Sequence, residues 1–137
     1  MHHHAKVLAI LARPEMLTKH QFAQRAGWRV GLVDKRKARG HLLALRQLDK
    51  PQLRYPAWQL KLVGDPDSRR AFATVLQLLE DPWQAYAFFT TPSATLNNAT
   101  PLAVWHSRPA ETLLQAARSW KVTVSAHEVC EGRSRVL

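Results

Sequence analysis

Two short helices separated by a tight turn are the feature of this sequence that most constrains its fold. The segment TKHQFAQRAG contains a capping box, because Thr18 is followed three residues later by Gln21. Gly27 can then end this helix in a left-handed conformation. A second helix is predicted over residues 29–39, with Gly40 as its stop. We therefore expect two consecutive helices joined by a turn of only a few residues.

The second predicted helix sorts its residues into two faces. At about 100° per residue, its inner side takes Val30, Val33 and the stem of Lys37. Cations dominate its outer side, which takes Arg29, Leu32, Lys35, Arg36 and Arg39. A cationic second helix after a short turn is typical of the helix-turn-helix arrangement, in which that helix enters the major groove of DNA.

The net charge of +10 lies entirely in the first half of the chain. Residues 1–70 contain 15 Lys and Arg against 5 Asp and Glu, whereas residues 71–137 contain 5 of each. Surfaces that serve only solubility usually mix both signs, so this excess favours nucleic-acid binding. Double-stranded DNA is favoured over RNA, because aromatic residues are not interleaved with the cations. The expected DNA-binding residues are Lys19, Arg29, Lys35, Arg36, Arg39, Arg46 and Lys61.

Beyond the second helix, the sequence predicts a small β element and then a boundary. The segments HLLALR and RYPAWQLKLV have the composition of short strands, so a β-hairpin, or wing, is expected beside the second helix, with Lys61 on it. The turn-rich segment GDPDSRR favours a boundary between residues 1–63 and residues 64–137. The expected fold is mainly α: an N-terminal helix-turn-helix with a wing, then a C-terminal helical domain.

The helices outside this pair are predicted from their caps. A short apolar helix over residues 5–13 is expected to cover the core, and Ser68 is expected to cap a helix at the start of the second domain. Asp81-Pro82 and Thr100-Pro101 each predict a new helix, the latter after a turn at Asn97-Asn98. A last helix is predicted from Pro109 to Trp120, and the tryptophans are expected to pack in the core.

Patterns for catalysis and for cofactor or metal binding are missing from the sequence, which has no P-loop, GxGxxG or HExxH motif. Cys130 lies near His127, but no third group orients that histidine. We therefore expect no enzyme and no cofactor. The single cysteine favours a reducing, cytoplasmic setting, and no run approaches the roughly 18 apolar residues of a membrane span. The histidines at positions 2–4 are excluded from the functional argument, because they can be natural or a tag remnant.

Several segments together resemble a known family. MLTKHQFAQRAGW, GHLLALR, RYPAWQLKLVG, DPWQAYAFFTTPSATLNNATPLAVW and ETLLQAARSW fall within about residues 16–120 and resemble the DNA-binding antitoxins of the Xre/MbcA/ParS type. The resemblance implies a bacterial homodimer that binds operator DNA through its first half. It also implies a partner-binding second half, whose usual partner is a RES-type toxin that degrades NAD. The partner-binding residues expected on this basis are Trp83, Thr100, Pro101, Leu102 and Trp105.

The favoured function is a DNA-binding transcriptional regulator with an antitoxin-like second half. One alternative is a type II antitoxin that neutralises a RES-type toxin and represses its own operon. Another alternative is a protein-only adaptor whose basic surface binds an acidic partner.

Overall fold

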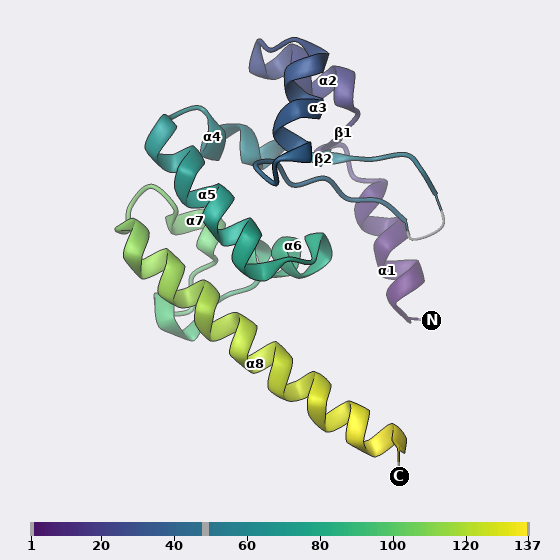
Figure 1. The fold of residues 1–137 in the computed structure, drawn as a ribbon, viewed down its shortest axis with the longest axis vertical. Coiled ribbons are helices and arrows are strands. Elements are labelled where there is room, and N and C mark those ends of the chain that lie inside the picture. Colours follow the sequence, from purple (N-terminus) through teal and green to yellow (C-terminus); the bar gives the residue numbers. More distant parts are fainter. Residues whose placement is uncertain (1, 48–49, 137) are drawn as a thin grey trace.

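The structure is a computed structural model that describes residues 2–47 and 50–136, with side chains described over residues 6–47 and 50–123. It is mainly helical with one small antiparallel sheet, which confirms the expected fold class. The α2–α3 pair lies at one end of the molecule, and the C-terminal half of α8 extends beyond the other helices (Figure 1). In chain order, the elements are α1 (His2–Leu11), β1 (Met16–Leu17), α2 (Lys19–Ala26), α3 (Val30–Ala38), β2 (Tyr55–Pro56), η1 (Ala57–Gln59), α4 (Leu60–Val63), α5 (Pro66–Leu79), α6 (Pro82–Thr90), η2 (Ala94–Leu96), α7 (Pro101–Val104) and α8 (Ala110–Val136).

The predicted capping box of α2 and the predicted glycines after α2 and α3 are confirmed. The Thr18 side chain accepts a hydrogen bond from the Gln21 backbone at 3.2 Å, and the Gln21 side chain accepts one from the Thr18 backbone at 2.9 Å. Gly27 ends α2 with a φ of 73°, and Gly40 follows α3 with a φ of 77°. These left-handed conformations are strained for residues with a Cβ, which explains the glycine at both helix ends.

The small sheet is present, but its strands are not the pair predicted from the sequence. β1 and β2 are antiparallel, with Leu17 opposite Tyr55. The expected hairpin between HLLALR and RYPAWQLKLV is reduced to a single bridge that joins Leu45 and Arg54. The rest of the second segment forms η1 and α4, because its buried positions, Gln59, Leu62 and Val63, follow the i, i+3, i+4 spacing of a helix.

The cap of α5 also differs from the prediction. Asp65, rather than Ser68, is the N-cap: its side chain accepts a hydrogen bond from the Ser68 backbone at 2.9 Å, and Pro66 occupies the first turn. The Ser68 hydroxyl instead donates to the Leu62 carbonyl at 2.6 Å and accepts from the Trp105 indole at 2.7 Å. A carboxylate followed by proline is the stronger start signal, so the helix begins three residues earlier.

The later start signals are confirmed. The Asp81 side chain accepts from the Trp83 backbone at 2.8 Å, and that of Thr100 accepts from the Ala103 backbone at 3.1 Å. The turn before Thr100 has left-handed residues at Asn97 and Asn98, with φ of 56° and 66°.

The first and last helices depart from their predicted extents. The last helix, α8, runs well beyond Trp120, because neither proline nor glycine occurs from Ala110 to Glu131. At the other end of the chain, α1 spans His2–Leu11 instead of the predicted residues 5–13. Among its described side chains, Ile10 is buried in the core, whereas Leu8 is 44% exposed.

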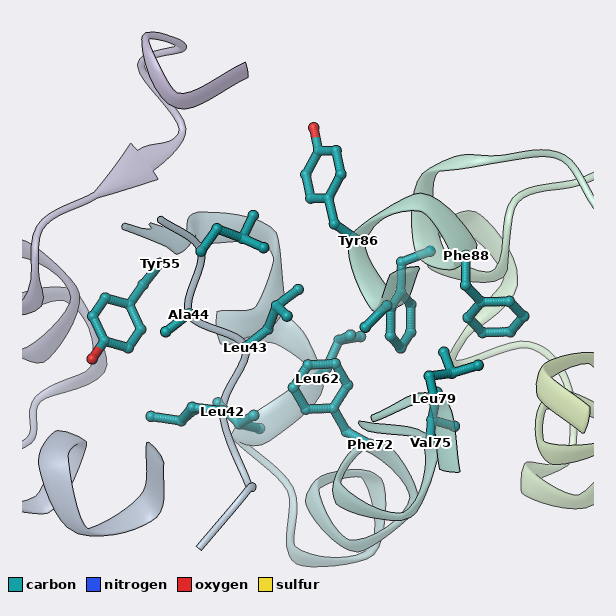
Figure 2. Close-up of a cluster of buried hydrophobic side chains, with 14 of the residues drawn as sticks. Leu42, Leu43, Ala44, Tyr55, Leu62, Phe72, Val75, Leu79, Tyr86 and Phe88 are labelled. Carbon is teal, nitrogen blue, oxygen red and sulfur yellow. The ribbon is translucent and has the colours of Figure 1, made fainter. Parts of the chain in front are cut away.

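One cluster of buried side chains includes residues from both sides of the predicted boundary at residue 64. Leu43 and Ala44 lie between Tyr55 on one side and Leu62 and Phe72 on the other (Figure 2). The division into two domains stays a prediction. Within the described residues, the helices are too short or too polar to cross a membrane.

Candidate nucleic-acid interface

The turn between α2 and α3 is only three residues long and is tied to α2. The Trp28 backbone donates to the Ala23 carbonyl at 2.9 Å, and the Gly27 backbone donates to the Gln24 carbonyl at 3.3 Å. Phe22 and Val33 are fully buried, one from each helix. Each helix therefore contributes a buried apolar side chain to the core, whereas several charged residues of α3 stay exposed.

Four cations on or beside α3 are exposed to solvent, namely Arg29, Lys35, Lys37 and Arg39. The exposure of Lys37 corrects the prediction that its stem lies on the inner side. The only acid in α3 is Asp34, and the Lys19 ammonium lies 3.1 Å from its carboxylate. Lys19 is therefore engaged in an ion pair, and its expected contact with a phosphate stays a prediction. The same pair neutralises Asp34 and leaves the other cations of α3 without a local counter-charge.

Arg36 is the main departure from the predicted outer face. Its guanidinium lies over the Trp28 ring, 4.2 Å from the ring centroid, and the side chain is partly buried. One terminal nitrogen, Nη1, is buried without a hydrogen-bond partner among the described residues. Burial lowers the pKa of Arg36 from its usual value, and the nearby charge of Arg69 lowers it further. Arg36 thus packs against Trp28 in the turn, instead of pointing outward as predicted.

The flanking residues lie on different elements from those expected. Arg46 is exposed, and its carbonyl accepts a hydrogen bond from the Trp83 indole at 3.1 Å, which links the segment after α3 to α6. Lys61 is also exposed, but it lies on α4 and not on a wing. Its carbonyl is 3.0 Å from a ring nitrogen of His106.

A groove of about 790 Å³ separates the segment after α3 from α5 and the start of α6. Its basic lining residues are Lys37, Arg39, His41, Arg69 and Arg70. Glu80 and Asp81 line it where α5 ends, so the groove is basic near the first turn of α5 and acidic at the opposite end. Arg69 and Arg70 lie outside the set predicted from the sequence. Their doublet is visible in the sequence, but only the folded chain brings it close to α3.

The residues expected to bind a partner all have roles within the chain. Trp105 is 4% exposed, and Pro101 is buried as well. Thr100 caps α7, while Leu102 and Trp83 are partly buried and pack against the core. The tryptophans therefore pack in or against the core, as expected. Trp83 and Leu102 are thus partly accessible to a partner, whereas Pro101 and Trp105 are not.

The side chains of His127 and Cys130 lie outside the described residues. In the described part of the chain, no group of three or more His, Cys, Asp or Glu side chains is arranged to hold a metal ion. Comparison with protein-family models, with curated proteins and with solved structures found no match for this chain.

Proposed function

We propose that this chain binds double-stranded DNA through α2 and α3, with α3 in the major groove, and acts as a DNA-binding regulator. The observation that carries the proposal is the outward face of α3. Its cations are exposed, while its single acid is neutralised by Lys19 from α2. A helix with this charge, held at a fixed angle by a short turn, matches the chemistry of phosphates and guanine edges.

The exposed cations have separate roles in this proposal. Lys35 and Arg39 are one helical turn apart and face the same way, so both side chains would reach base edges in the major groove of the DNA. Arginine can donate two hydrogen bonds to one guanine, which makes Arg39 the base-reading residue. Arg29, at the N-cap of α3, and Arg46 would contact phosphates. Arg36 would support the helix through Trp28 rather than read a base.

The test is a fluorescence anisotropy titration across salt concentration, with two duplexes. One duplex is selected by the protein from a random library, and the other is unselected. Each neutralised phosphate contributes about 0.9 to the slope of log affinity against log salt, so several contacts give a steep dependence. Arg39→Ala should cost roughly 1–3 kcal/mol on the selected duplex and less on the unselected one.

The matched control is Arg118→Ala, which removes the same charge from the exposed face of α8 and should leave both affinities near those of the wild type. A salt-independent affinity would reject DNA binding. Equal losses on both duplexes for Arg39→Ala would show that α3 supplies charge only and that bases are read elsewhere. The homodimer and the RES-type toxin partner stay predictions from the family resemblance.

A further inference from the structure

We propose that the basic end of the groove binds a phosphate of the DNA backbone, so that α5 contacts DNA together with α3. This inference rests on the proposed function and extends it to a helix in the second half of the chain. The phosphate-binding residues would be Lys37 near the end of α3 and Arg69 from the first turn of α5, beside the base-reading Arg39.

Cations from two helices meet here without an anion of the protein between them. Lys37 and Arg39 are exposed and line the groove together with Arg69. Arg36 lies at the same junction, with one guanidinium nitrogen buried and unpartnered among the described residues. Burial lowers the pKa of Arg36, and repulsion by the positive charge of Arg69 lowers it further. A bound anion would relieve this repulsion.

The acids near the groove are already engaged. Asp67 forms an ion pair with Arg70, so these two charges cancel. The Glu80 carboxylate lies 3.6 Å from the Lys121 ammonium, and Asp81 accepts the Trp83 backbone N–H that caps α6. Lys37, Arg39 and Arg69 therefore remain as three positive charges that no carboxylate of the groove lining neutralises.

Arg69 is well placed to hold a phosphate. Arg69 lines the groove, and one of its terminal nitrogens donates to the Val63 carbonyl at 3.3 Å. A guanidinium has five N–H donors, so further donors remain for phosphate oxygens. Because the hydrogen bond to Val63 already restricts the planar guanidinium, binding a phosphate would cost little further side-chain entropy.

The position of Arg39 favours a DNA phosphate over a free one. Arg39 lies on the outer arc of α3 and also lines the groove. A DNA strand whose bases face α3 would carry its next phosphates past Arg39 and towards Arg69. Inorganic phosphate has the same chemistry, so the experiment must separate these two sources.

The test uses Arg69→Gln in the salt titration, with Arg118→Gln as the control of equal charge. Loss of one phosphate contact should reduce the salt slope by about 0.9 and weaken binding to selected and unselected duplexes by the same factor. Arg118→Gln should leave the slope unchanged. Arg69→Lys should keep most of the slope, because a phosphate contact requires the charge, whereas a loss due only to the Val63 contact would persist in this variant.

The outcomes separate this inference from the proposed function. A flat slope for the wild-type protein would overturn both. A steep wild-type slope that Arg69→Gln leaves unchanged would overturn the phosphate contact on α5 while DNA binding by α3 stands. Inorganic phosphate is then titrated at constant ionic strength without DNA. If millimolar phosphate raises the melting temperature of the wild type but not of Arg69→Gln, and DNA affinity is equal in both, the site binds free phosphate and the DNA assignment is wrong.

Discussion

Replacement of Gln59 should destabilise this protein more than replacement of other glutamines. Gln59 is the only fully buried polar side chain among the described residues, with an exposed fraction of 0%. Its carbonyl oxygen accepts the Leu43 backbone N–H at 2.9 Å, and its amide nitrogen donates to the Leu43 carbonyl at 2.8 Å. The side chain thus provides the hydrogen bonds that a neighbouring strand would otherwise give to the segment after α3.

The size of the effect follows from these two bonds. Gln59→Leu keeps the side-chain volume similar but leaves a buried N–H and a buried C=O without partners. Each unsatisfied group costs about 1–3 kcal/mol, so the expected loss of unfolding free energy is about 2–6 kcal/mol. This is a large share of the roughly 5–15 kcal/mol that stabilises a typical domain. The segment that Gln59 holds connects α3 to β2, so DNA binding should weaken as well.

The measurement is urea unfolding followed by tryptophan fluorescence, with Gln115→Leu as the matched control. Gln115 is exposed on α8, so its replacement should change the unfolding free energy by less than about 0.5 kcal/mol. The midpoint for Gln59→Leu should fall while the dependence on urea stays the same. A loss below about 1 kcal/mol for Gln59→Leu would refute the reasoning, because the Leu43 groups would then have found other partners.

Two further predictions concern α2, α3 and the tyrosines. Gly27→Ala should destabilise the protein by about 1–2 kcal/mol, because Gly27 has a φ of 73° with open space around it. Gly31→Ala, in α3 and equally open, should stabilise it by up to about 1 kcal/mol. A urea midpoint that rises for Gly27→Ala would contradict the first expectation, and one that falls for Gly31→Ala would contradict the second. Burial raises the pKa of Tyr55, as does the charge of Asp34. The folded state therefore keeps the phenol neutral where the unfolded chain ionises, so stability falls as the pH rises above about 10. Tyr55→Phe should lessen this fall, measured by unfolding at about pH 9 and about pH 11, and an unchanged fall would disprove the assignment; Tyr86, whose pKa burial also raises, would supply the remainder.

Features that depend on neighbouring residues could be read from the sequence. The capping box of Thr18 and Gln21, the left-handed Gly27 and Gly40, and the Asp81 and Thr100 caps are set by residues within four positions of one another. The cationic face of α3 could be predicted for the same reason, because helical periodicity within one short segment determines it.

Features that join distant segments could not be read in the same way. The pairing of Leu17 with Tyr55, the bonds from Gln59 to Leu43, and the position of Arg36 over Trp28 each depend on which surfaces the core brings together. The segment RYPAWQLKLV has strand-like composition, yet burial of Leu62 and Val63 favours a helical turn there.

The candidate site likewise contains one part that the sequence predicts and one part that depends on packing. The outward face of α3 follows from helical periodicity in a single segment, so its exposed cations were largely predictable. The contribution of Arg69 was not, because 30 positions separate it from Arg39, and its place beside α3 depends on how α5 packs in the shared core. Periodicity determines which side of a helix is polar, whereas packing between helices determines which polar sides meet.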